Sequence, residues 1–152
     1  MAFITFQEVF DIAVMTALIG FLFMDLIPIR GDLKQRFKLA AISLAPVIIL
    51  HELAHKFTAM AFGLKAVFHA FYAESFTLFL GMFAILAKLA NFGLVFLVPG
   101  FVRICENNNG SIDLACNATL QANPLWGAII AFAGPAMHLL FLIGSTLILK
   151  KY

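Results

Sequence analysis

The sequence predicts an all-α polytopic membrane protein with about four transmembrane helices. This prediction rests on the overall composition and on the spacing of long apolar runs. Hydrophobic residues make up 63% of the 152 residues and charged residues 12%, whereas soluble domains average about 45–50% apolar and about 25% charged residues. The formal net charge of +2 is small, and no basic block points to nucleic-acid binding. We therefore expect a multi-pass protein of the cell membrane in which residues 1–152 form a single domain.

Four apolar segments are long enough to cross the hydrocarbon core, which takes about 20 residues of helix. The connection of residues 63–75 follows a glycine that could end a helix, and its β-branched and aromatic residues allow a short β element after residue 63. Lys88 lies inside the third segment, where it either snorkels, faces the bundle interior or marks a broken helix. The predicted spans are residues 10–29, 39–62, 76–98 and 126–149, with a short basic connection at 30–38 and a polar loop at about 99–125.

The polar loop contains Cys105 and Cys116 and two N-glycosylation patterns, which begin at Asn109 and Asn117. Two cysteines suffice for one disulfide, and two free thiols are the alternative. These features favour an extracytoplasmic loop. With four spans, however, the same orientation places the basic connection outside, against the positive-inside tendency. The two signals disagree, and we favour an orientation with the long loop outside.

The second span contains the motif His51-Glu52-Leu53-Ala54-His55. Residues four apart lie on one face of a helix, so the two imidazoles can bind one zinc ion. Glu52 is then placed to act as the general base on the water that zinc activates. Three ionisable groups inside an apolar span are costly unless they are paired or bound to a metal. We therefore prefer a zinc site to a merely structural polar cluster.

Two histidines do not complete a catalytic zinc site, which usually has three protein ligands and a water. The remaining candidates for the third ligand are Asp25 near the end of the first span, His69 and Glu74 after the motif helix, and His138 in the middle of the fourth span.

Three blocks of the sequence resemble the site-2 protease family of intramembrane zinc metalloproteases, and its archaeal members in particular. Residues 51–68, "HELAHKFTAMAFGLKAVF", are similar to the family's motif helix and the strand-like segment after it. Residues 93–104, "GLVFLVPGFVRI", and 131–144, "AFAGPAMHLLFLIG", resemble its PGAV-containing and AGP-x-x-N segments. The resemblance implies that His51 and His55 bind zinc, that Glu52 is the catalytic base, and that the substrate is a transmembrane or membrane-proximal helix.

Two features depart from the family pattern. The family's third zinc ligand is an aspartate in a later Leu-Asp-Gly motif, which this sequence lacks, and His138 stands where the family usually has asparagine. The chain is then truncated, or it is an inactive relative within a larger complex, or His138 is the third zinc ligand. The last explanation is plausible because the family's AGP helix packs near its metal helix. A hydrogen bond from His138 to a backbone carbonyl or another span is the alternative.

The sequence thus predicts an intramembrane zinc metalloprotease that hydrolyses peptide bonds of membrane-embedded substrates. Its expected cofactor is Zn²⁺, and its expected partners are membrane lipids and a transmembrane protein substrate. The alternative is a non-catalytic subunit or scaffold of a larger membrane complex. A metal-handling membrane protein ranks last, because it gives no role to Glu52 or to the AGP block.

Overall fold

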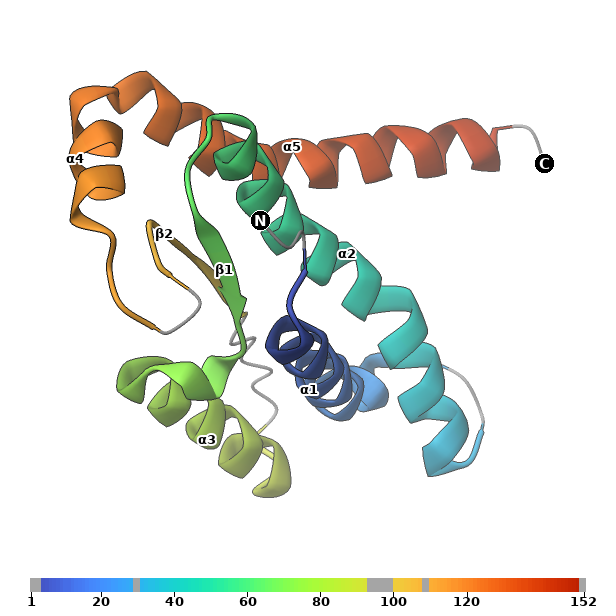
Figure 1. Cartoon of the computed structure of the whole chain (residues 1–152). Coiled ribbons are helices and arrows are strands. Elements are labelled where there is room, and N and C mark those ends of the chain that lie inside the picture. Colours follow the sequence, from blue (N-terminus) through green and yellow to red (C-terminus); the bar gives the residue numbers. More distant parts are fainter. Residues whose placement is uncertain (1–3, 29–30, 93–99, 108–109, 151–152) are drawn as a thin grey trace. The chain divides into compact units, whose positions relative to one another are not determined.

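A computed structural model of the chain describes residues 4–28, 31–92, 100–107 and 110–150. It is mostly helical, at 75%, with a small two-stranded sheet (Figure 1). The predicted helical class and the β element after residue 63 are therefore confirmed. The elements are α1 (Phe6–Phe23), η1 (Met24–Leu26), α2 (Leu33–Ala61), β1 (Ala66–His69), η2 (Phe71–Ala73), α3 (Ser75–Leu89), β2 (Phe101–Ile104), α4 (Leu114–Ala122) and α5 (Pro124–Leu149).

Both N-terminal helices begin earlier than the apolar runs alone suggest, because polar side chains cap them. Thr5 and Glu8 form a capping box at the start of α1, in which each side chain bonds the backbone N–H of the other. Asp32 Oδ1 accepts a hydrogen bond from the backbone N–H of Gln35 at 2.8 Å, which satisfies a free donor at the start of α2. The basic residues predicted as a connection therefore form the first turns of α2.

Three helical segments in the described part of the chain are long and apolar enough to cross a membrane: Phe6–Leu26, Leu33–Ala61 and Pro124–Leu147. They correspond to the first, second and fourth predicted spans. The third predicted span, residues 76–98, is not confirmed, since α3 covers only Ser75–Leu89 and residues 93–99 lie outside the described ranges.

Much of the apolar surface of α5 is exposed. Phe132, Leu139 and Leu140 are each more than half exposed, and an apolar patch of this kind on a helix needs a covering. Lipid is the covering that a helix of this length and composition indicates.

The chain divides into two compact units, and the boundary falls inside α2. The first unit comprises Met1–Ile49 and His69–Phe101, and the second comprises Leu50–Phe68 and Val102–Tyr152. The whole histidine motif therefore belongs to the second unit, together with α4 and α5.

In the first unit, one face of α1 is buried through Met15, Leu18, Ile19 and Leu22, which recur at the helical period. Lys88 on α3 turns toward the same helix. Its ammonium donates a hydrogen bond to the Leu22 carbonyl at 3.2 Å and forms an ion pair with Asp25. Lys88 therefore faces α1, and α3 ends one residue later at Leu89, so the inward-facing position and the interrupted helix considered for this lysine occur together.

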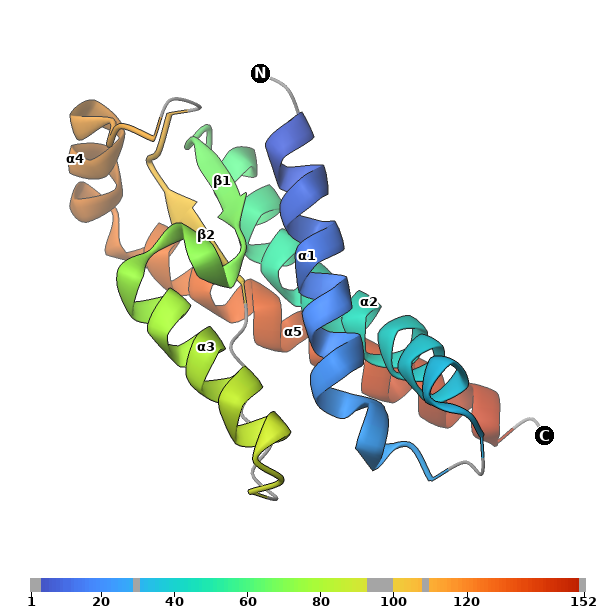
Figure 2. The same cartoon turned by 90° about the horizontal axis from the view of Figure 1, so that it is seen from below.

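In the second unit, a small apolar core joins the end of α2, the sheet and α5. Its buried members are Ala59, Leu64, Ala66, Cys105 and Ile130. Helix α2 stops where predicted, because Gly63 adopts a left-handed conformation with φ of +75°, which glycine adopts at little cost. Figure 2 shows α4 at the start of α5, the helix that contributes Ile130 to this core.

The loop predicted at 99–125 is more structured than expected, since it contains β2 and α4. Helix α4 forms because Asp113 caps it, accepting hydrogen bonds from the backbone N–H groups of Ala115 and Cys116 at 3.1 Å. Cys105 and Cys116 are joined in a disulfide, so of the two alternatives that the sequence left open, the bridge is the one found. Of the two glycosylation patterns, the one at 109 falls outside the described residues, and 117 lies in α4.

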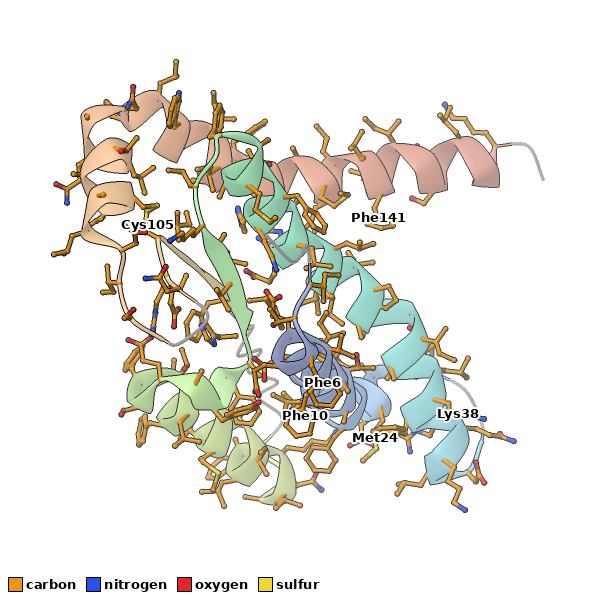
Figure 3. The ribbon with its side chains drawn as sticks, viewed as in Figure 1. Phe6, Phe10, Met24, Lys38, Cys105 and Phe141 are labelled. Carbon is orange, nitrogen blue, oxygen red and sulfur yellow. A yellow bond between two sulfur atoms is a disulfide. The ribbon has the colours of Figure 1, made fainter. Side chains whose placement is uncertain are left out.

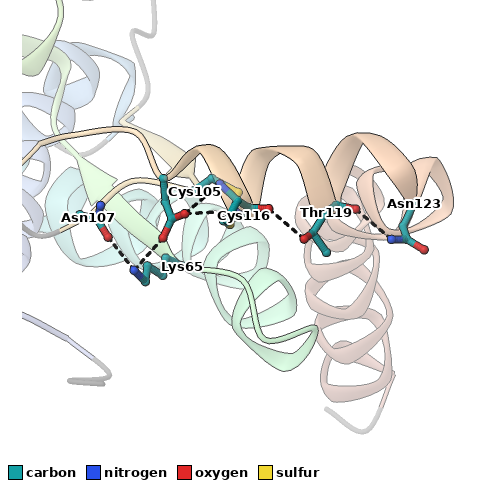
Figure 4. The surroundings of a disulfide bond; sticks show 8 residues. Lys65, Cys105, Asn107, Cys116, Thr119 and Asn123 are labelled. Carbon is teal, nitrogen blue, oxygen red and sulfur yellow. Dashed lines mark hydrogen bonds and ion pairs between the residues drawn. A yellow bond between two sulfur atoms is a disulfide. The ribbon is translucent and has the colours of Figure 1, made fainter.

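A lysine that follows α2 forms hydrogen bonds with this loop (Figure 4). Lys65 Nζ donates hydrogen bonds to Asp113 at 2.8 Å and to Asn107 at 2.7 Å. The hydrogen bond from Lys65 lowers the pKa of Asp113 below its usual value. The loop is thus held to the second unit by a disulfide and by a charged contact.

Breaking the disulfide is expected to destabilise the second unit. Its cysteines are 11 residues apart, and closing a loop of that size stabilises a fold by about 2–3 kcal/mol. Cys116→Ser should lower the melting temperature, followed by circular dichroism in detergent, and dithiothreitol should lower that of the wild type equally. Adding dithiothreitol to Cys116→Ser is the control, and it should have no further effect. A wild-type melting curve unmoved by dithiothreitol would contradict the prediction.

Candidate metal centre

The two motif histidines face each other on α2. Their Nε2 atoms are 3.1 Å apart, as the i, i+4 spacing predicts. Two nitrogens bound to one tetrahedral zinc at about 2.0–2.1 Å lie about 3.3–3.4 Å from each other. The observed separation is therefore close to that of two nitrogens bound to one zinc ion. The two rings would have to move apart only slightly to bind it.

His55 is held in the form that a metal ligand needs. Its Nδ1 lies 2.6 Å from the carbonyl oxygen of Ile130 on α5. A carbonyl only accepts hydrogen bonds, so Nδ1 is the donor, and in the neutral ring the lone pair lies on Nε2, where it accepts a hydrogen bond from Nε2–H of His51. Histidines that bind metals commonly donate their second N–H to a backbone carbonyl in this way. The contact with α5 thus fixes both the tautomer and the ring orientation.

His51 has a buried polar atom to which no hydrogen bond is made. Its Nδ1 is buried without a partner among the described residues. Leaving a buried polar group unpaired costs about 1–3 kcal/mol. Folded proteins tend to carry such costs at functional sites.

Gly134 on α5 marks the closest approach to the histidine pair. A Cβ atom at this position would lie 2.4 Å from His55 Nε2 and 2.5 Å from His51 Nε2, much closer than non-bonded atoms come. Only glycine therefore fits at this point of α5, where the backbone packs against both Nε2 atoms. The glycine of the AGP block, considered in the sequence as a packing or cleft-wall residue, borders the candidate site directly.

Three residues of α5 at successive four-residue steps meet the histidine pair. Ile130 supplies the carbonyl, Gly134 a close approach of the backbone, and His138 a third imidazole, because residues i, i+4 and i+8 share one helix face. The centroids of the His138 and His51 rings are 4.6 Å apart. The structure therefore brings together the three histidines predicted as ligands.

The three imidazole rings are not arranged as a complete set of metal ligands. No group of three His, Cys, Asp or Glu side chains is arranged to hold a metal ion in the part of the chain that the structure describes. A nitrogen of His138 would have to turn toward the pair by rotation about its side-chain torsions.

The other third-ligand candidates lie in the first unit and have local contacts or positions of their own. Asp25 pairs with Arg36 and Lys88. His69, at the end of β1, packs its ring against Phe101. Glu74 is exposed at the start of α3.

Glu52 follows His51 directly and projects about 100° further round the helix axis. Its side chain is half-buried. Within the described residues, it has no hydrogen-bond or ion-pair partner. A carboxylate without a structural partner beside a histidine pair is free to take part in proton transfer.

No protein-family model, no curated protein and no solved structure matches this chain. Its function is therefore inferred from its own residues.

Proposed function

We propose that the protein is an intramembrane zinc metallopeptidase of the cell membrane that hydrolyses peptide bonds of membrane-embedded substrates. The observation that carries this proposal is the pair of Nε2 atoms 3.1 Å apart on a helix long and apolar enough to span a membrane. One ring of the pair is already set in the metal-binding tautomer by Ile130. The resemblance of three sequence blocks to site-2 proteases supports the same assignment.

Each residue of the site then has a distinct role. His51 and His55 hold the ion, and His138 is the third ligand that we propose. Zinc, when bound, supplies a Lewis acid that polarises a peptide carbonyl and makes water more acidic. Glu52 accepts the proton of the attacking water and returns it to the leaving amine nitrogen. Gly134 keeps a side chain out of the space that these groups share.

Zinc content tests the ligand set. Wild-type protein, purified in detergent and analysed by inductively coupled plasma mass spectrometry, should contain about one zinc per chain. His51→Ala and His55→Ala should each remove it, and His138→Ala should lower the affinity markedly, because a tetrahedral site needs the third donor. His69→Ala is the matched control and should keep its zinc. Unchanged zinc in His51→Ala and His55→Ala would refute the metal site, and unchanged zinc in His138→Ala would remove only that ligand.

A second function is favoured by the incomplete ligand set among the described residues. We propose as the alternative a non-catalytic subunit or scaffold of a larger membrane complex. It predicts co-purification with membrane partners and no peptide cleavage by any variant. A purified chain that cleaves a membrane substrate alone would exclude it.

A further inference from the structure

We propose that a groove between α1 and the start of α2 binds one anionic phospholipid. The groove lies wholly in the first unit, so this proposal is separate from the histidine site. It depends on the membrane placement of α1 and α2 but not on zinc. The cavity has a volume of about 520 Å³, within the usual range for ligand sites of about 300–1,000 Å³.

The inner surface of the groove is apolar. Phe21 and Met24, at the end of the first candidate span, face Leu33 and Phe37 on the first turns of α2. Figure 3 labels Met24 together with Lys38, which also lines the groove. A surface of this kind suits part of an acyl chain, since hydrocarbon gains from leaving polar surroundings.

Two lysines lie one turn apart at the start of α2. Lys34 and Lys38 line the same groove, and residues four apart share a helix face. Neither lysine has an ion-pair or hydrogen-bond partner in the part of the chain that the structure describes. Both ammonium groups are therefore available to a ligand.

The other charged groups nearby are already engaged. Asp32 also lines the groove, but its Oδ1 accepts the hydrogen bond that caps α2. Arg36 bonds Asp25 at 2.6 Å and the carbonyl of Met24 at 3.1 Å. What the groove offers is thus the two ammonium groups of Lys34 and Lys38 against the one carboxylate of Asp32, a net positive charge beside an apolar surface.

The length of α2 places these lysines at headgroup depth. Its 29 residues rise about 44 Å at 1.5 Å each, whereas the hydrocarbon core is about 30 Å thick. The charged turns at its start therefore project into the headgroup layer. An anionic phospholipid supplies both parts of the match, because its phosphodiester faces the two ammonium groups and its acyl chain covers the apolar floor.

Native mass spectrometry of the full-length chain tests this proposal with phosphatidylglycerol and phosphatidylcholine of identical acyl chains. We expect one phosphatidylglycerol to be retained in preference to phosphatidylcholine. Each lysine near an anionic lipid contributes about fivefold in binding, so Lys34→Gln/Lys38→Gln should bind about 25-fold more weakly. Leu33→Trp should reduce binding of either lipid by filling the groove, and since Leu33 is 65% exposed, this change should leave the fold intact. Lys150→Gln, an exposed lysine at the end of α5, is the control and should bind as the wild type does.

Three results would overturn the proposal. They are equal retention of the two lipids by the wild type, undiminished phosphatidylglycerol binding by the double lysine variant, and displacement of the lipid by an equal concentration of inorganic phosphate. The last would identify a free-phosphate site in place of a lipid site. Melting curves of each variant, measured without added lipid, show whether the variant is folded. They exclude unfolding as the cause of lost lipid binding.

Discussion

Gly134→Ala is expected to abolish zinc binding under the conditions in which the wild type retains one ion. The added methyl would lie 2.4 Å from Nε2 of His55 and 2.5 Å from Nε2 of His51, so α5 or the imidazoles must move. Displacing the support of a ligating histidine typically costs about 10–100-fold in metal affinity, and filling the ligand space directly costs more. Overpacking of this kind also destabilises a fold by about 1–3 kcal/mol. Zinc titration against a chromogenic chelator measures the affinity.

The same helix supplies matched controls for this variant. A Cβ at Gly127 or at Gly144 would meet no atom within 4 Å among the described residues. Gly127→Ala and Gly144→Ala therefore make the same chemical change in α5 without touching the histidines. Both should bind zinc as the wild type does. Wild-type affinity in Gly134→Ala would show that zinc does not occupy the space between His51 and His55.

Glu52→Gln is expected to reduce peptide cleavage by about 10²–10⁴-fold, the usual contribution of a general base. Glutamine keeps the size of the side chain but does not accept a proton at neutral pH. Zinc content should stay at the wild-type level, because Glu52 is not one of the proposed ligands. Cleavage of a panel of single-span reporter proteins, reconstituted with the purified enzyme, provides the measurement.

Glu74→Gln is the control for this experiment, since Glu74 is exposed at the start of α3 and lies outside the motif. It should cleave at the wild-type rate. Equal cleavage by the wild type and Glu52→Gln would remove Glu52 from the mechanism. Zinc binding without cleavage in every variant would instead favour the non-catalytic subunit.

The disulfide also has a structural link to the histidines. Cys105 packs in the same apolar core as Ile130, whose carbonyl accepts the hydrogen bond from His55. A less rigid loop would therefore give Ile130, and with it the ring of His55, more freedom to move. The sequence marked Cys105 and Cys116 as a possible pair but offered no connection between them and the motif.

Local pattern was enough to predict much of the fold. Helix α5 lies within two residues of the predicted fourth span, since Pro124 is well suited to a first helical turn. The starts of α1 and α2 were less well predicted, because the capping side chains of Thr5 and Asp32 extend both helices beyond their apolar runs. The third span, predicted from hydropathy alone, is not confirmed. The apolar run continues to residue 98, but α3 ends at Leu89.

The sequence by itself determined that His51 and His55 share one face of an apolar helix with Glu52 beside them, because the helical repeat fixes the positions of residues four apart. Only the tertiary structure decided what meets that face: the carbonyl of Ile130, the missing side chain at Gly134 and the ring of His138. These residues lie more than 70 positions further along the chain than the histidine motif. Their contact depends on how two helices pack, and the spacing of residues within either helix does not contain that information.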